Sequence, residues 1–238
     1  GNTLHELGRL EEAEASCEQA LVLKPDNAEV KVQKALLLLN RQEFQLGWSL
    51  YISSRDPKYE IVEFDIADFS LFKSMVTPDF FIERAELWKG TSLGGKSIQV
   101  HATQGVGDEI LFASCIPDLI QESPKSIHLE CDPRLQPLFA RSFPEVTVRG
   151  VARARRSSQE DNGTDSLIEG VDFDYSIPID GLPQFFRNKI EDFPSRDGFL
   201  VPDPEGVDKW KKRLDDLGEG LKIGISWFGG DAKLRKKC

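Results

Sequence analysis

Apolar positions up to residue 54 follow a helical rhythm, with spacings of three and four residues. The first apolar stripe consists of Leu7, Leu10, Ala13, Cys17, Ala20 and Leu21. It stops at Pro25-Asp26-Asn27, a combination typical of a helix end, and a second helical stretch follows. The pattern therefore predicts consecutive helices in this part of the chain.

From residue 97 the pattern changes to short apolar runs that alternate with helical stretches. The runs cover residues 97–102, 126–131, 145–150, 173–179 and 221–227, and the helical stretches cover residues 108–121, 133–143 and 206–220. Strands that alternate with helices predict a parallel sheet of the doubly wound α/β type.

Two stretches lie outside this alternation. Residues 55–96 carry many aromatic side chains without steady periodicity, which predicts a connector packed on a neighbour rather than a free linker. Its expected anchors are Phe69, Phe72, Phe80, Phe81 and Trp88, and a hydrophobic binding patch is the alternative. Residues 152–166 are polar, with charges of both signs, and predict a surface loop.

Composition narrows the class of protein. The chain of 238 residues has a formal net charge of −10, which argues against broad nucleic-acid binding. No apolar run reaches the roughly 18 residues of a membrane span. The four cysteines show no paired spacing, so we expect reduced thiols in a cytoplasmic protein. No histidine–carboxylate spacing suggests a metal site.

The main candidate site is the segment QGVGD, residues 104–108, which follows the first strand and opens a helix. Ligands of doubly wound sheets bind at the carboxyl ends of strands. The segment is no P-loop, because no Gly-Lys-Ser/Thr follows, and Ile110 stands where a dinucleotide fingerprint needs its third glycine. Asp108 has two candidate roles: an N-cap of the helix, or a general base that takes a proton from an acceptor hydroxyl.

Further polar residues are expected beside strand ends. His101 ends the first strand and is a candidate ligand contact, whereas His128 lies mid-strand and fits a structural role. Glu130 ends the second strand, where a ribose-binding acid would sit. The last strand is followed by candidates for contacts to a phosphate-bearing donor, with an exposed basic tail as the alternative: Trp227, Gly229 and Gly230.

The helical stretches repeat with an offset of 34 residues, the period of tetratricopeptide repeats. Leu10 corresponds to Phe44, and Ala13 corresponds to Gly47. The segment GRLEEAEASCEQALVLKPDNAEV resembles such a repeat. Because one and a half repeats cannot bury a repeat core alone, we expect the end of a longer array.

The order of the segments resembles that of bacterial tetratricopeptide-repeat proteins whose C-terminal half is glycosyltransferase-like, with the GT-B fold. The resemblance is carried by LWKGTSLGGKSIQVHATQGVGDEILFASCIPDLI, CDPRLQPLFARSFPEV and KIGISWFGG, and extends distantly to heptosyltransferases and O-linked N-acetylglucosamine transferase. It implies repeats over residues 1–54, a connector over 55–96, a Rossmann-like acceptor-side domain over 97–220, and a second domain that starts at 221 and is cut short.

The resemblance also implies a function. The parent protein would transfer a sugar from a nucleotide-sugar to a hydroxyl of a protein or glycan, by inversion, with no metal and no cofactor beyond this co-substrate. Asp108 would be the base, and the loop from Gln104 to Gly107, with its glycines Gly105 and Gly107, would shape the acceptor pocket. The repeats would hold the acceptor or a protein partner. We expect the chain alone to be inactive, because GT-B enzymes bind the nucleotide-sugar mainly in the second domain.

The alternative function is a catalytically inactive interaction scaffold. The commoner form of the family has a glutamate before Gln-Gly and an Arg-Tyr pair after the phenylalanine. This sequence has Thr103, Ser114 and Cys115 at those places. The three departures favour a loss of catalysis.

Overall fold

The computed structural model describes residues 2–55, 85–103, 105–151, 172–195 and 198–225. Contacts divide the chain into two compact units, Gly1–Val201 and Pro202–Cys238. The N-terminal helices and the sheet thus belong to one unit. The domain boundaries predicted after residues 54, 96 and 220 stay predictions.

Residues 2–55 are helical: α1 (Asn2–Glu6), α2 (Leu10–Leu23), α3 (Ala28–Asn40) and α4 (Phe44–Arg55). The Asn27 side chain starts α3, because its oxygen accepts a hydrogen bond from the Val30 N–H at 3.3 Å. Ala13 and Cys17 of α2 are buried against Leu37 of α3. Part of the predicted apolar stripe therefore forms a contact between helices, whereas its first member, Leu7, is 65% exposed.

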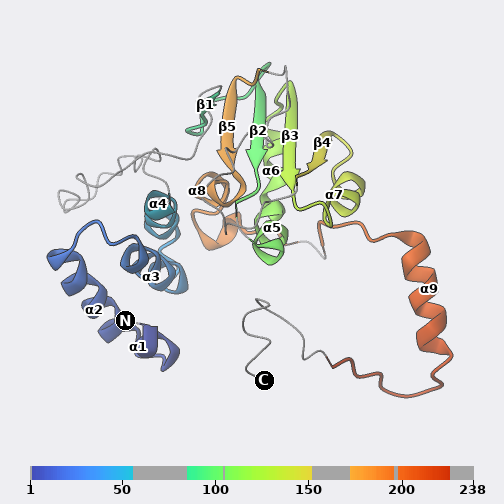
Figure 1. Ribbon diagram of the computed structural model, residues 1–238, viewed down its shortest axis with the longest axis horizontal. Helices are drawn as coiled ribbons and strands as arrows, with labels where there is room; N and C mark the ends of the chain where they lie inside the picture. The colour runs from blue at the N-terminus through green and yellow to red at the C-terminus, as the bar shows by residue number, and fades with distance from the viewer. Residues whose placement is uncertain (1, 56–84, 104, 152–171, 196–197, 226–238) are drawn as a thin grey trace, which may run out of the picture. The chain divides into compact units, whose positions relative to one another are not determined.

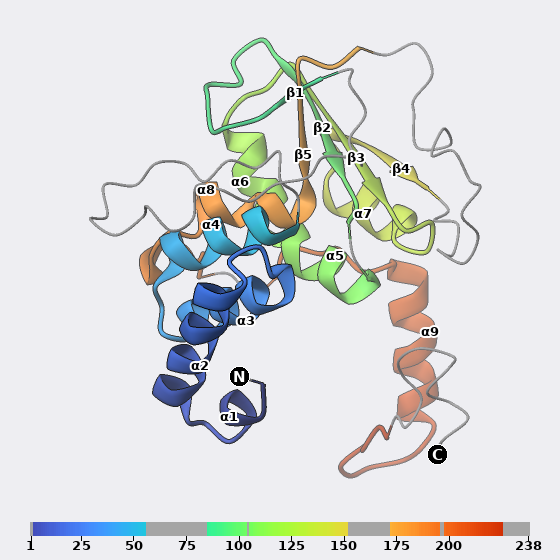
Figure 2. The same cartoon turned by 60° about the vertical axis from the view of Figure 1, so that its left-hand side comes forward.

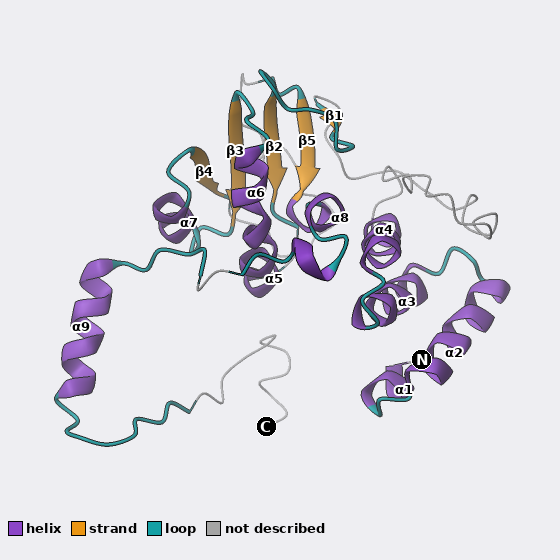
Figure 3. Ribbon diagram, turned by 180° about the vertical axis from the view of Figure 1, so that it is seen from behind, coloured by secondary structure: helices purple, strands orange, loops and turns teal. Residues whose placement is uncertain are grey.

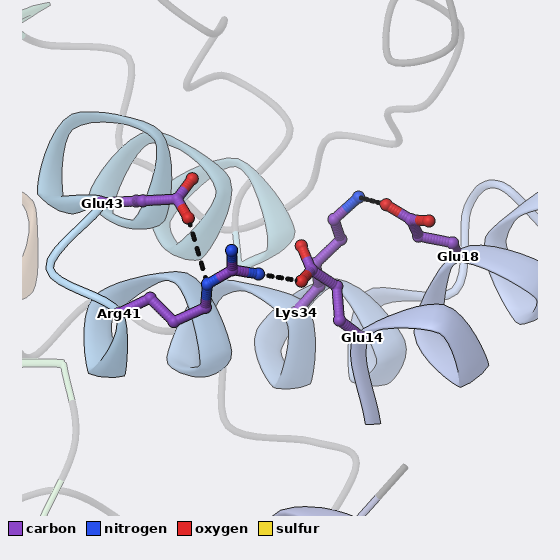
Figure 4. Close-up of polar contacts among 5 residues, drawn as sticks. All are labelled: Glu14, Glu18, Lys34, Arg41 and Glu43. Atoms are coloured by element: carbon purple, nitrogen blue, oxygen red, sulfur yellow. Dashed lines mark hydrogen bonds and ion pairs between the residues drawn. The ribbon is translucent and has the colours of Figure 1, made fainter. Parts of the chain in front are cut away.

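Charged side chains bridge α2, α3 and the start of α4 (Figure 4). Lys34 Nζ lies 3.0 Å from Glu18 Oε1, and Arg41 pairs with Glu14 and, at 3.3 Å, with Glu43. These pairs are partly exposed, and exposed ion pairs contribute only about 0–1 kcal/mol each. The ion pairs therefore add little to the stability of the contact between the helices.

The described strands form a five-stranded parallel sheet in the order β1-β5-β2-β3-β4. They are β1 (Glu86–Leu87), β2 (Ser97–His101), β3 (Ser126–Cys131), β4 (Val146–Gly150) and β5 (Tyr175–Pro178). Val100 pairs with Leu129 on one side and Ile177 on the other, and all three are fully buried. Burial on both faces is typical of central parallel strands, so the predicted α/β class is confirmed.

The helix predicted over residues 108–121 is interrupted. α5 (Val106–Phe112) runs into a 3₁₀ turn, Ala113–Cys115, and α6 (Ile116–Gln121) follows. Pro117 lies in the first turn of α6 and has no N–H to continue the bonds of α5. Figure 3 shows α6 crossing one face of the sheet in front of β2 and β3. The remaining helices of the unit, α7 (Gln136–Ser142) and α8 (Pro183–Phe186), follow β3 and β5.

The last N-terminal helix, α4, packs on the sheet part of the same unit (Figure 2). The Phe112 ring lies 6.3 Å from Trp48 and 6.4 Å from Tyr51, between centroids. Trp48 Nε1 donates to the Arg187 carbonyl at 2.9 Å. Arg187 is itself buried and pairs with Asp118, Nη2 to Oδ2, at 2.7 Å. Helices α3 and α4 therefore share one core with the sheet.

Trp88 is the described member of the predicted connector anchors. It is 1% exposed, its Nε1 donates to the Thr91 carbonyl at 2.7 Å, and its ring lies 4.6 Å from that of Phe185. Core packing is therefore confirmed for this residue. Four other anchors and the predicted loop 152–166 lie outside the described residues: Phe69, Phe72, Phe80 and Phe81.

The second unit contains α9 (Pro204–Asp215), which Asp203 caps by accepting a hydrogen bond from the Gly206 N–H at 3.0 Å. Residues 221–225 form no strand, contrary to the prediction, because no described strand pairs with them. Residues 226 and 227 lie outside the described part. Across the described residues, no helix has the length and apolarity that crossing a membrane requires.

Candidate functional site

The order of strands reverses between β2 and β5. From β2 the chain places β3 and β4 on one side and returns to place β5 on the other. In doubly wound sheets such a reversal marks where ligands bind, outside the carboxyl ends of the strands. Figure 1 shows these ends pointing to the edge where α5 and α8 lie. We call residues 101–103, 105–109, 130–132 and 178–181 the carboxyl edge.

Residues 105–108 lie at the carboxyl edge and lead into α5. The N-cap residue is Gly105 rather than Asp108. The Gly105 N–H donates to Asp108 Oδ2 at 3.2 Å, and its carbonyl accepts from the Glu109 N–H at 3.0 Å. A side chain at the third helical position that reaches back in this way is one half of a capping box. Asp108 therefore caps the helix from inside its first turn, and its role as a base stays a prediction.

Gly105 and Gly107 are not required by the backbone or by packing among the described residues. Gly105 has ordinary extended angles, with φ −79° and ψ 167°, and Gly107 is helical. A Cβ at Gly105 would lie 3.5 Å from Asp108 Oδ2, an ordinary contact, and a Cβ at Gly107 would have no neighbour within 4 Å. The bare backbone at Gly107 thus leaves open space at the carboxyl edge.

His101 and Glu130 form a pair at the ends of β2 and β3. The parallel register, in which Val100 pairs with Leu129, places these next residues side by side. His101 Nδ1 lies 3.4 Å from Glu130 Oε2, and their side chains are 16% and 6% exposed. Glu130 Oε1 accepts a hydrogen bond from Gln99 Nε2 at 2.9 Å. Glu130 is thus held within the sheet beside His101, not turned outward as a ribose-binding acid.

The sequence analysis did not identify two buried acids at the carboxyl edge as candidate site residues. Glu109 is 1% exposed, and its Oε2 accepts a hydrogen bond from the Asp132 N–H at 2.7 Å. It therefore joins α5 to the loop after β3. Asp180 follows β5 and is 2% exposed. Each acid adjoins apolar residues, and this was the signal available in the sequence.

The Thr103 hydroxyl is a buried polar group at the carboxyl edge. Thr103 Oγ1 makes no hydrogen bond to any described residue. Such a group carries a desolvation cost that a bound ligand or water can relieve. In the described part of the chain, no three His, Cys, Asp or Glu side chains gather as metal ligands.

The structure places the remaining candidates as follows. His128 packs on Phe173, with ring centroids 4.8 Å apart, and burial lowers the pKa of His128. This environment fits the structural role expected for a mid-strand histidine. Four candidates lie outside the described residues: Gln104, Trp227, Gly229 and Gly230.

Comparison with known proteins finds one curated relative. Protein FlbA of Caulobacter vibrioides is 34% identical over 231 residues, which cover 93% of this chain and 35% of FlbA. The chain thus spans about a third of the length of this relative. No family model and no solved structure matches the chain.

Proposed function

We propose that this chain is the acceptor-side part of a glycosyltransferase that moves a sugar from a nucleotide-sugar to a hydroxyl of a protein or glycan. The observation that carries the proposal is the carboxyl edge itself. A glycine-containing loop, a histidine–carboxylate pair and a buried hydroxyl, which has no partner in the described part of the chain, meet where the strand order reverses. This is the position at which doubly wound sheets bind ligands.

The resemblance to tetratricopeptide-fused GT-B enzymes supports the choice of reaction. Helices α1 to α4 are proposed to be the end of a repeat array that holds the acceptor or a protein partner. The residues of the sheet are proposed to form the first of two Rossmann-like domains. The loop from Gln104 to Gly107 would shape the acceptor site, and Asp108 is the base that the resemblance implies.

A non-catalytic interaction scaffold is the second candidate. The hydrogen bond from the Gly105 N–H to Asp108 Oδ2 supports it, because this bond gives Asp108 a structural role that needs no substrate. The substitutions at Thr103, Ser114 and Cys115 relative to the commoner family pattern point the same way. In this case the helices would bind a protein partner, and the sheet would only support the helices.

Titration of the full-length natural protein with UDP-, GDP- and ADP-sugars by calorimetry separates the two functions. Saturable binding of one nucleotide-sugar is the result expected of the transferase, and acceptor screening follows. A folded full-length protein that binds none of them contradicts the transferase. Pull-downs with residues 1–201 as bait, the compact unit, would then test the scaffold.

A further inference from the structure

Transfer of a sugar to a hydroxyl releases the hydroxyl proton, so the proposed function, on which this inference rests, requires a group that takes up this proton. We propose that His101, oriented by Glu130, accepts this proton in place of Asp108. Glu130 is then a positioning residue, and Gln99 holds Glu130. No feature of the sequence pattern alone pairs these three residues.

The geometry of the pair favours a basic nitrogen on the far side of the ring. Glu130 Oε2 lies 3.4 Å from His101 Nδ1, so the carboxylate selects the tautomer in which Nδ1 carries the hydrogen. In that tautomer Nε2 is the nitrogen that can take up a proton. The carboxylate also stabilises the imidazolium that forms, as the third member of a catalytic triad does.

Glu130 is well fixed for such a task. It is 5% exposed, and its second oxygen accepts from Gln99 Nε2 at 2.9 Å. Gln99 is itself 6% exposed and lies two residues before His101 on the same strand. A buried carboxylate held by Gln99 at one oxygen presents its other oxygen to His101 Nδ1 and so orients the imidazole.

Asp108 has a structural task instead. Its Oδ2 accepts from the Gly105 N–H at 3.2 Å and closes the first turn of α5. Taking a proton there would weaken the cap, because a neutral carboxyl is a poorer acceptor than a carboxylate. Thr103 Oγ1 has no partner among the described residues and lies two residues beyond His101, so it gives the carboxyl edge a further group for a bound hydroxyl.

The proposed step balances as follows. The acceptor oxygen attacks the anomeric carbon of the donor sugar and forms the new glycosidic bond. The bond from that carbon to the diphosphate oxygen breaks, and its electron pair leaves with the nucleoside diphosphate. The hydroxyl proton passes to His101 Nε2, and Glu130 faces the resulting imidazolium.

The tautomer of His101 is measurable without any turnover. The chain has three histidines, so ¹⁵N correlation spectra of the rings are readily assigned with His5→Gln and His128→Gln variants. We expect His101 to carry its hydrogen on Nδ1, and Glu130→Gln to change the tautomer population. A wild-type His101 with its hydrogen on Nε2 would overturn the proposal.

Turnover of the full-length natural protein gives the second readout, measured as nucleoside diphosphate released from UDP-, GDP- and ADP-sugars. Loss of a general base typically costs 10²–10⁴-fold, so we expect His101→Gln to lower kcat by at least about 100-fold, with KM little changed. Glu130→Gln should shift the acid limb of the kcat–pH profile, and Asp108→Asn should leave that limb in place.

Three results would contradict this assignment. If His101→Gln keeps its turnover while Asp108→Asn loses it, Asp108 is the base and the transferase stands. If Glu130→Gln leaves the acid limb where it is in wild type, Glu130 has only a structural role. If the folded wild type releases no nucleoside diphosphate from any donor, the proposed transferase function is wrong, and so is the role of His101 as a base. The ¹⁵N spectra still show whether Glu130 sets the tautomer of His101.

Discussion

At the residue scale, the buried polar groups differ in whether another group of the protein forms a hydrogen bond with them. Glu130 and Glu109 have hydrogen-bond donors within the fold, whereas Thr103 Oγ1 and His128 Nδ1 have none among the described residues. A satisfied buried acid can orient a neighbour. An unpaired buried group costs free energy, and this makes it sensitive to its surroundings.

His128 should make stability depend on pH. Its pKa is lowered from the usual 6.5 by burial, so the unfolded chain binds the proton more readily than the folded chain. Stability is therefore lost as the pH falls from 6.5 toward the folded-state pKa. We expect a lower melting temperature at pH 5.5 than at pH 7.5, and a smaller difference in His128→Phe.

The matched control for this prediction is His5→Gln, which removes a histidine from α1 and leaves His128 in place. It should keep the wild-type difference between the two pH values. An equal difference in wild type and His128→Phe would show that other groups produce the pH dependence.

At the element scale, α3 and α4 approach closely because Gly47 has no side chain. A Cβ there would lie 2.7 Å from Leu39 Cδ2 and 3.1 Å from the Leu39 backbone nitrogen. Overpacking of this kind costs about 1–3 kcal/mol, against a gain of up to about 1 kcal/mol from better helix propensity. We therefore expect Gly47→Ala to lower the free energy of unfolding in denaturant titration.

Gly107→Ala is the matched helical control, because its Cβ would meet no described atom within 4 Å. This variant should be as stable as wild type or slightly more stable. Equal stability losses in both variants would mean that the contact with Leu39 is not the cause at Gly47.

The starts of β2 and β5 are joined by Asp174. Its Oδ2 accepts from the Ser97 N–H at 2.8 Å, and its Oδ1 accepts from Lys96 Nζ at 3.0 Å. The Ser97 backbone bond is the main cause that lowers the pKa of Asp174 from 3.8 to about 2, with Lys96 and the Ser97 hydroxyl adding to it. The stabilisation is therefore complete above pH 3.8 and is lost as the pH falls toward 2.

Acid unfolding of wild type and Asp174→Asn tests this connection between the strands. We expect the variant to lose less stability than wild type between pH 4 and pH 2.5, because its amide does not titrate. The exposed neighbour Asp172, changed to Asn, is the control and should behave as wild type does. Parallel curves for wild type and Asp174→Asn would refute the role of Asp174.

At the scale of the whole molecule, α4 makes the N-terminal helices part of the same unit as the sheet. Trp48→Ala removes the bond to the Arg187 carbonyl and the contact with Phe112. Loss of a large aromatic side chain costs about 3–5 kcal/mol when it is fully buried, and Trp48 is half-buried, so we expect about 2–3 kcal/mol. Hydrogen exchange should then increase in residues 28–55 and also in 97–131.

Trp210→Ala is the control, because Trp210 lies in the second unit and is 55% exposed. It should leave exchange in residues 28–55 and 97–131 unchanged. If Trp48→Ala raises exchange in residues 28–55 alone, the helices and the sheet unfold independently.

The sequence by itself determined the local elements and their order. The spacing of Ala13 and Cys17, the stop at Pro25 and the runs over residues 97–102 and 126–131 all report periodicity within a few residues. Local periodicity predicts most of the helices and the strands of the parallel sheet, because backbone geometry dictates it. It does not predict the 3₁₀ turn that interrupts the helix expected over residues 108–121, and the strand expected over 221–227 does not form at residues 221–225.

Only the tertiary structure decided which side chains of different elements contact one another. The pairing of His101 with Glu130 depends on the register of two strands, and the shared core of α4 and the sheet depends on Trp48 meeting Phe112 and Arg187. These partners are distant along the chain. Their contacts arise from packing, which no local pattern of apolar and polar residues encodes.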